Sequence, residues 1–563
     1  MHTFIRQTGR RGWAAFLLAA VLLSAGGCVP EPHKPQGTFN LDFSLPSGSE
    51  TSGAIVFLVD GVNTEVFNEM LENGELPAIR YYFIDRGLYC PRTMVNTPSV
   101  TLANETSVVT GVFPGHHNIT GINWFDRNRL IWRDYETIAQ KNTLDGDYGN
   151  KTIYQHFPHR TTFSLFYQAH KGTTKFVENW TSAGPPFFFG WYEFVDRLTL
   201  SRFDLLMEVA RTRREFPAFT MVYQLAPDFR AYGYGVSDQR YRAAMKHTDT
   251  QIGRVLADVE RAGLLEKLHL VLLSDHSLMD VKKHAPVDKT LRELGLKVSD
   301  ARLWEKTPFE ERMEVYRRSN CVLYGSGDRY WAIQLRKPHR IRPHKMDRAD
   351  KEPRFHPWPV RPNAEDLTVY PLPGDRVENI PAYLLTRHDG VDAVAVTTGK
   401  DKAVLMRKAG AVEFHQPGGP GKPVYYRLIR GDDPLGYAGH VPAEVLAGNR
   451  PLTPRRWLEL TNDTQFPDVP PQLVAYFRAE RAGDIVLFAA PGWDFGTRNR
   501  AGHGGLRPGD VHVPMAIAGP GVPKGKRIDA ARTVDLVPTI LTLIGKDVPA
   551  GLDGQSLVGA ADK

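Results

Sequence analysis

The chain has 563 residues, of which 42% are hydrophobic and 24% are charged, and its formal net charge is +7. This composition excludes a chain that is disordered throughout, and the length favours a large catalytic domain with insertions, or two to three domains. Three cysteines are too few for a cysteine-based zinc site, so any metal ion must be held by Asp and His side chains.

An export signal is predicted at the start of the chain. Three arginines precede an apolar run over residues 13–23, which is followed by small residues. The run is about a dozen residues long, whereas a membrane-spanning helix needs ~20, so a cleaved signal is favoured over a membrane span. A buried N-terminal helix is the alternative.

The apolar run ends in Leu-Ser-Ala-Gly-Gly-Cys, which resembles the bacterial lipobox. That resemblance implies cleavage before Cys28, a lipid on its thiol and contact with a membrane through that lipid. We therefore expect a lipid-anchored protein of the bacterial cell envelope, on the periplasmic side. Residues 28–50 are rich in Pro, Gly and Ser, which predicts a flexible linker.

Four short apolar segments have the pattern of strands that are buried on both faces of a parallel sheet. Helical periodicity separates them, most clearly over residues 238–262, and residues 513–541 add a further strand and helix. This alternation favours an α/β fold with a mostly parallel central sheet flanked by helices. The four predicted strands are residues 54–59, 218–225, 269–274 and 483–489.

Side chains suited to binding metal follow each of these segments. Asp60 ends the first, Asp228 lies just past the second, Asp275 and His276 end the third, and His503 follows the fourth. Ligands of such sheets bind beyond the carboxyl ends of the strands. Any one of these acids alone is more often a helix cap or a turn residue. Their recurrence after successive strands predicts a metal site.

Residues 291–480 interrupt this alternation. The runs 392–397 and 402–407 predict antiparallel strands, and the basic stretch 336–345 is either a solvated loop or an anion-attracting rim. We predict an inserted α+β cap subdomain here. The predicted organisation is a signal peptide (1–27), a linker (28–50), a first part of the core (51–290), the cap (291–480) and a second part of the core (481–563).

A motif for the nucleophile lies between the first two strands. The segment Thr101-Leu-Ala-Asn104, followed by Thr110-Gly111, Pro114 and His117, resembles the nucleophile motif of type I phosphodiesterases and nucleotide pyrophosphatases, a branch of the alkaline phosphatase superfamily. The resemblance implies an alkaline-phosphatase-like core in which Thr101 attacks phosphorus and Asn104 hydrogen-bonds a phosphoryl oxygen. A threonine hydroxyl is a weak nucleophile unless a metal ion lowers its pKa.

The same resemblance implies two divalent metal ions, for which zinc is favoured and manganese or another ion is the alternative. One ligand of the second ion departs from the family pattern, because Tyr232 stands where a histidine is expected. Tyrosine is a weaker zinc ligand than histidine, so the second ion would bind loosely, use water or another side chain such as His247, or be a harder cation. A site that has lost turnover is the other alternative. The matching metal ligands are Asp60, Thr101, Asp275 and His276 for the first ion, and Asp228 and His503 for the second.

The favoured function is hydrolysis of a small-molecule phosphate ester, either a diester or a monoester, with Thr101 as nucleophile. A sulfatase of the same fold is disfavoured, because residues 100–104 lack the Cys or Ser pattern of those enzymes. The remaining alternative is a catalytically impaired envelope lipoprotein that binds anionic ligands. No dedicated nucleic-acid-binding module is predicted, and the sequence indicates no oligomeric state.

Overall fold

The computed structural model describes residues 39–137, 139–178, 180–339 and 354–559. The predicted signal peptide and Cys28 lie outside these ranges. Within them, none of the helices is both long and apolar enough to span a bilayer. The described end of the predicted linker differs from expectation, because Leu41 and Phe43 are buried against the core and the Leu41 amide donates to Asp258 Oδ2 at 3.0 Å. A flexible linker therefore does not extend to residue 50, since these two apolar side chains hold it.

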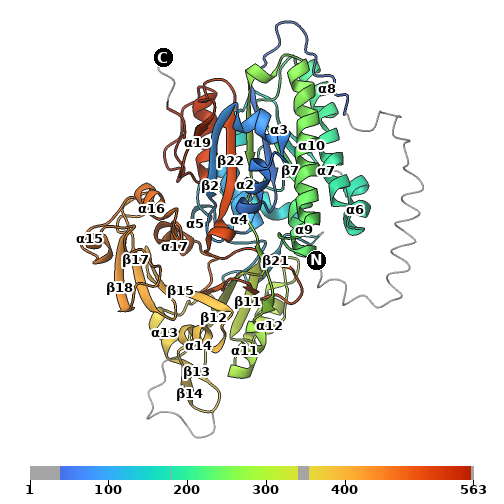
Figure 1. Ribbon diagram of the computed structural model, residues 1–563. Helices are drawn as coiled ribbons and strands as arrows, with labels where there is room; N and C mark the ends of the chain where they lie inside the picture. Colours follow the sequence, from blue (N-terminus) through green and yellow to red (C-terminus); the bar gives the residue numbers. More distant parts are fainter. Residues whose placement is uncertain (1–38, 138, 179, 340–353, 560–563) are drawn as a thin grey trace.

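An eight-stranded, mostly parallel sheet forms the upper half of the molecule in Figure 1. Its central strand is parallel to both neighbours, and the antiparallel pairs are those that β22 makes with β8 and β2. The prediction of an α/β fold with a mostly parallel sheet is confirmed. The strands, in sheet order, are β23 (Lys526–Arg527), β2 (Gly87–Met94), β22 (His512–Ala518), β8 (Leu268–Leu273), β1 (Gly53–Val59), β7 (Phe219–Gln224), β5 (Thr162–Leu165) and β6 (Lys175–Val177).

The two faces of β1 pack against different sets of helices. Residues 54, 56 and 58 join a core with α4 (Thr101–Thr110) and α19 (Leu536–Leu543). Residues 55, 57 and 59 join a core with α2 (Thr64–Glu72), α8 (Phe203–Arg213) and α10 (Gln239–Arg261). Successive side chains of a strand point to opposite faces, so an uninterrupted apolar run is what a sheet covered on both faces requires.

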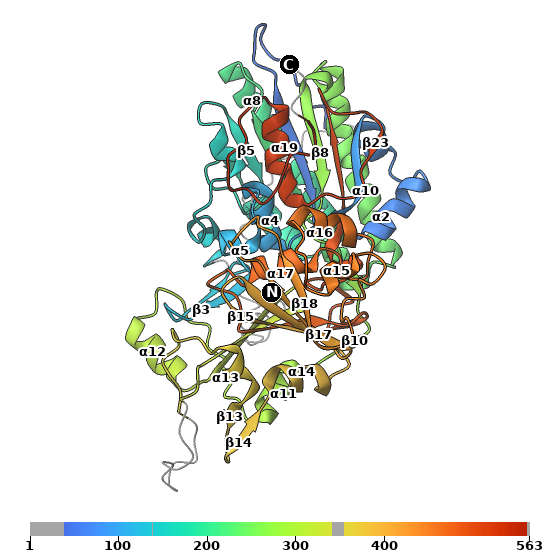
Figure 2. The same ribbon diagram turned by 90° about the vertical axis from the view of Figure 1, so that its left-hand side faces the viewer.

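A second, seven-stranded antiparallel sheet lies below the first one in both views (Figures 1 and 2). The antiparallel pairing predicted for residues 392–397 and 402–407 is confirmed. The prediction for residues 483–489 is wrong, because this segment is a middle strand of the second sheet. The strands, in sheet order, are β11 (Cys321–Ser326), β12 (Tyr330–Leu335), β19 (Ile485–Ala489), β15 (Val391–Gly399), β16 (Lys402–Met406), β17 (Gly410–His415) and β18 (Tyr425–Gly431).

The error has a simple physical cause. All five residues of β19 are buried, as they are in a central parallel strand, so burial alone does not distinguish the two kinds of sheet.

The boundaries predicted at residues 290 and 480 stay predictions. Cys90 in β2 and Cys321 in β11 are both buried and free, which leaves no disulfide between them.

Candidate metal centre

The predicted ligands come together beyond the C-terminal ends of β1, β7 and β8. Asp60 directly follows β1, and Asp228 lies in the first turn of α9 (Ala226–Tyr234), which begins after β7. These two segments approach closely at Gly61, which has a φ of +67°. A Cβ atom at Gly61 would lie 2.8 Å from Asp228 Cα, so only glycine allows this approach.

The ligand side chains form two groups that share one histidine. Asp60, Asp275 and His276 each offer a ligand atom within 4.8 Å of the others, and so do Asp228, His276 and His503. All five residues are buried. The rings of His276 and His503 are stacked with centroids 3.5 Å apart. The geometry therefore provides two adjacent positions at which a cation could be held.

Backbone carbonyls fix the orientation of both histidines. Nδ1 of His503 lies 2.7 Å from the carbonyl oxygen of Ser99, and Nδ1 of His276 lies 3.2 Å from that of Ser277. A carbonyl only accepts, so each Nδ1 carries the proton and each Nε2 keeps its lone pair. Histidines that bind metal are held in this way. Burial and the neighbouring His276 keep the pKa of His503 well below its usual range, which favours the neutral form that ligation requires.

The carboxylates fit the same purpose. One buried oxygen of each of Asp60, Asp228 and Asp275 has no hydrogen-bond partner among the described residues. Burial, together with the charge of Asp60, raises the pKa of both Asp228 and Asp275. Three close carboxylates, each with a buried oxygen that no donor reaches, are costly unless cations neutralise them. The donor set of oxygen and imidazole nitrogen atoms suits zinc and similar divalent ions.

Thr101 is the first residue of α4, and its hydroxyl faces this centre. Its Oγ1 atom lies 3.1 Å from Nε2 of His276. That nitrogen is also 3.2 Å from Oδ1 of Asp60. The hydroxyl is thus next to the Asp60, Asp275 and His276 group, at the N-terminus of a helix whose dipole favours anions.

Asn104 differs from the expectation that it donates to a phosphoryl oxygen. It is fully buried, and its amide nitrogen donates to the carbonyl oxygens of Asn96, Pro98 and Val100 at 3.0 to 3.3 Å. Its Oδ1 atom accepts from the Asn96 backbone N–H at 2.7 Å. The side chain is one turn inside α4 and is saturated by the preceding loop. Asn104 therefore positions the Thr101 loop.

We expect Asn104→Ala to lower the free energy of unfolding by about 1–3 kcal/mol, because the buried polar groups of the 96–100 loop lose their partner. Urea titration of the variant measures this change. Asn128→Ala, in an exposed loop, is the matched control and should change stability by less than about 0.5 kcal/mol. Equal stability of the two variants would contradict the positioning role of Asn104.

The position of Tyr232 leaves the second group one ligand short. Its ring is 5.8 Å from that of His503, centroid to centroid, so it does lie beside the site. Burial and the charges of Asp228 and Asp328 raise its pKa further, which keeps the phenol neutral and a weak ligand. His247 does not replace it, because its Nε2 atom lies 3.1 Å from the carbonyl oxygen of Glu193.

Sequence reasoning missed Tyr223, whose hydroxyl donates to Oδ2 of Asp60 and leaves Oδ1 toward the centre. A tyrosine one residue before the end of strand β7 was the available signal. It also missed the turn between β11 and β12. The amide of His503 donates to the carbonyl of Gly327 at 2.8 Å, and the amide of Arg329 donates to that of His503 at 3.0 Å. The second sheet thus holds the His503 loop.

Arg329 in this turn also makes a buried ion pair. Its Nε atom is 2.7 Å from Oδ1 of Asp510, and both side chains are fully buried. Further N–H groups of Arg329 donate to carbonyls of residues 489, 490 and 493. The backbone carbonyl of Asp510 accepts from the amide of Ser277, next to His276. Ser277 has no positive φ, so its backbone conformation does not require glycine.

Comparisons of sequence place these features in a family. The profile of the family described as type I phosphodiesterase / nucleotide pyrophosphatase matches residues 54–379. A venom phosphodiesterase of Macrovipera lebetinus is 24% identical over 247 residues, which are 42% of this chain and 27% of that protein. Human ectonucleotide pyrophosphatase/phosphodiesterase family member 1 is 24% identical over 261 residues, 44% of this chain and 26% of that protein. The matched region thus spans about a quarter of the length of these curated relatives.

Solved structures agree in fold. Murine ectonucleotide pyrophosphatase / phosphodiesterase 5 superposes with a TM-score of 0.52 and 12% sequence identity, covering 88% of this chain and 96% of the murine chain. An inactive variant of the murine protein in complex with AMP gives the same values. The family profile and the sequence relatives give no support to the anion-binding alternative. With the profile covering more than half of its residues, this chain belongs to the type I phosphodiesterase/nucleotide pyrophosphatase family, with its alkaline-phosphatase-like fold.

Proposed function

We propose that this protein hydrolyses small phosphate esters, with Thr101 as nucleophile and two divalent ions, zinc being favoured. The observation that carries the proposal is the hydroxyl of Thr101, 3.1 Å from Nε2 of His276, among five buried ligand side chains with unpartnered carboxylate oxygens. Family membership supports the same reaction class. A nucleotide is a candidate substrate, because the murine relative was solved with AMP.

Each residue of the site has a separate role in the proposed reaction. Asp60, Asp275 and His276 would hold one ion, and Asp228 and His503 would hold the other. When bound, such ions lower the pKa of a hydroxyl or of water and neutralise charge on the transferred phosphoryl group. Thr101 Oγ1 forms a bond to phosphorus as the leaving alcohol or phosphate departs with a proton. Water then cleaves the phosphothreonine ester, releasing phosphate or a phosphomonoester and restoring the hydroxyl.

The test of this proposal measures metal content and turnover together. The soluble chain from residue 39 onward is analysed for bound metal and assayed with 4-nitrophenyl phosphate and bis(4-nitrophenyl) phosphate, with added zinc or manganese. We expect about two ions per chain and hydrolysis of at least one ester. Absence of turnover with every divalent metal would overturn the proposal.

The departure at Tyr232 gives a directional prediction. We expect Tyr232→His to lower the zinc dissociation constant of the second site at least about tenfold, because neutral imidazole is a better zinc ligand than a neutral phenol. Competition with a zinc chelator measures the constant. Tyr234→His, in the same helix but exposed, is the matched control. An equal effect of both variants would show that residue 232 does not reach the metal.

Metal binding should also depend on pH. Burial raises the pKa of Asp228 and Asp275, so these ligands hold protons at a pH at which ordinary carboxyl groups, with a pKa near about 4, are ionised. Bound zinc displaces those protons, so zinc affinity should increase as the pH rises through the range above the usual carboxyl pKa. Calorimetry in two buffers of different ionisation enthalpy measures the protons released. Zinc affinity that is constant over this range would contradict the prediction.

We also propose that the protein is anchored to the cell envelope, on its periplasmic side, by a lipid on Cys28. The support is the lipobox-like sequence that ends at this residue. Labelling of growing bacteria with an alkyne fatty acid should mark the wild-type protein and not Cys28→Ser. A wild-type protein without label would refute the anchor.

A further inference from the structure

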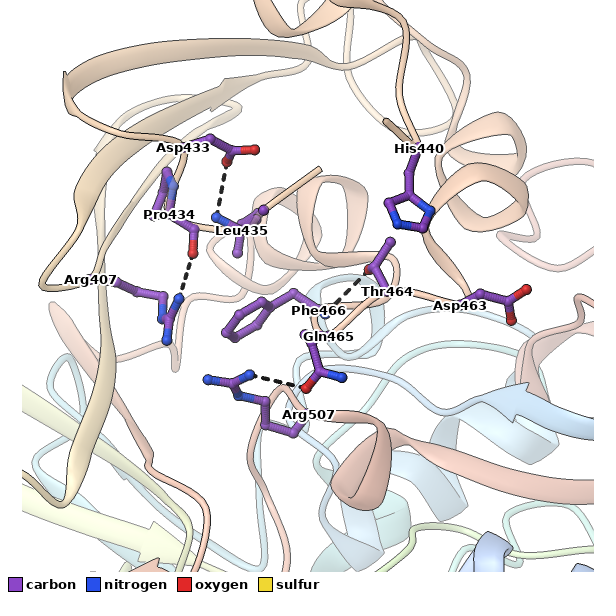
Figure 3. Close-up of a pocket in the computed structure, with 11 residues that line it drawn as sticks. Arg407, Asp433, Pro434, Leu435, His440, Asp463, Thr464, Gln465, Phe466 and Arg507 are labelled. Carbon is purple, nitrogen blue, oxygen red and sulfur yellow. Dashed lines mark hydrogen bonds between the residues drawn. The ribbon is translucent and has the colours of Figure 1, made fainter. Parts of the chain in front are cut away.

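A cavity that none of the five metal ligands lines lies against the second sheet. It has a volume of about 480 Å³, and its wall includes Arg407, His440, Phe466 and Arg507. Figure 3 shows the two guanidinium groups beside the Phe466 ring, with His440 on the opposite side of the cavity. Arg407 follows β16, and Arg507 lies four residues after His503. Four residues span at most about 14 Å, so the cavity is close to the metal centre.

The carboxylate of Asp392 pairs with both arginines and fixes their positions. Nε of Arg407 lies 3.1 Å from Oδ1 of Asp392, and Nε of Arg507 lies 2.8 Å from Oδ2 of the same carboxylate. Both guanidinium carbons are above the Phe466 ring, at 4.5 and 4.1 Å from its centroid. Asp392 does not line the cavity. Two cations share one anion, so this cluster keeps an excess positive charge on the cavity side.

Unused donors remain on both arginines. A guanidinium group has five N–H bonds. Arg407 uses Nε and Nη2 on Asp392 and Nη1 on the carbonyl of Pro434. Arg507 uses Nε and Nη2 on Asp392 and Nη1 on Gln465. The side chains are 22% and 15% exposed, so a ligand can reach the N–H groups that remain.

Among the described residues, neither acidic residue of the wall pairs with Arg407 or Arg507. Asp433 turns to its own loop, where it accepts from the amides of Leu435 and Tyr437 and from the hydroxyl of Tyr426. Asp463 pairs with Arg92 at 2.8 Å. The cavity therefore offers a preorganised guanidinium pair to a ligand, and planar forks of this kind match the oxygen pairs of phosphate and carboxylate groups.

We propose that this cavity is a second binding site, distinct from the metal centre, for an anionic group of the phosphate or carboxylate class. The two guanidinium groups would bind either a free anion or a second anionic group of the substrate, because both present the same oxygen atoms. Binding of a substrate group rests on the proposed function, whereas binding of a free anion does not.

Phosphate titration calorimetry of the zinc-loaded chain tests the site. We expect two phosphate sites in the parent protein, and loss or at least tenfold weakening of one of them in Arg407→Gln/Arg507→Gln. Arg478→Gln is the matched control, because Arg478 makes a similar half-buried ion pair with Asp401 in the same sheet region but does not line the cavity. This control should keep both sites.

Equal phosphate binding by the double variant and the control would overturn the proposal. If the double variant does not fold, Arg407→Lys/Arg507→Lys, which keeps the charge and removes the fork, should still weaken one site, and unchanged binding would again overturn it. The KM of the double variant is then compared with that of the parent protein for two esters. A larger rise in KM for a dinucleoside polyphosphate than for bis(4-nitrophenyl) phosphate assigns the site to the substrate. An equal change in KM for the two esters assigns it to a free anion. Absence of turnover on both esters would refute the proposed function, while the phosphate titration still decides on the second site.

Discussion

Thr101→Ala should lower kcat by at least about a thousandfold, because the oxygen that bonds to phosphorus is removed. The change removes the hydroxyl and methyl groups of the first residue of α4 and leaves the five carboxylate and histidine side chains in place. Most of the bound metal should therefore remain. Steady-state hydrolysis of bis(4-nitrophenyl) phosphate and elemental analysis of the same sample measure the two quantities.

Thr101→Ser is the matched control, since it keeps the hydroxyl and removes one methyl group. It should retain far more activity than the alanine variant. Single-turnover mixing followed by mass spectrometry should detect a phosphorylated Thr101 peptide in the wild-type protein. Comparable turnover by Thr101→Ala and the wild-type protein would rule out Thr101 as the nucleophile.

Arg329→Met should lower the free energy of unfolding by about 3–5 kcal/mol, because Asp510 is left as an uncompensated buried charge. The two side chains are fully buried, and the guanidinium also satisfies carbonyls of residues 489, 490 and 493. Urea unfolding followed by circular dichroism measures the change. Arg478→Met, which breaks a more exposed ion pair, is the comparison and should cost less.

The double variant Arg329→Met/Asp510→Leu separates the charge from the packing. Replacing both partners of a buried ion pair by apolar residues is often close to neutral, so the double variant should recover part of the loss. If the double variant is as unstable as the single one, the effect comes from the lost hydrogen bonds to the backbone carbonyls.

The clustering of the side chains that end strands was predictable from the sequence. Asp60, Asp275 and His276 directly follow apolar runs, and the geometry of a parallel sheet brings such positions together. The same local signal did not assign the segment 483–489 to its sheet, because strand pairing depends on residues far away in the chain. Local pattern identifies a strand, and tertiary contacts decide its neighbours.

The orientation of single side chains was not predictable. Asn104 is near Thr101 in sequence, yet its amide turns inward to the 96–100 loop. Tyr223 and the carbonyl of Ser99 orient metal ligands, and both contacts join residues more than 150 positions apart in sequence. Such partners carry no motif, since a hydroxyl or a backbone carbonyl can be supplied by many residue types.

The contact between the Gly327 turn and His503 has a consequence for the order in which the protein matures. A chain made from its N-terminus completes the Asp60, Asp275 and His276 group while the second sheet is still being synthesised. His503 comes later, and its amide is held only after β11 and β12 have formed their turn. The first group of side chains can therefore come together on a nascent chain, whereas the group that contains His503 requires both sheets. Loading of the second ion would then report that the chain has been released and has completed its fold.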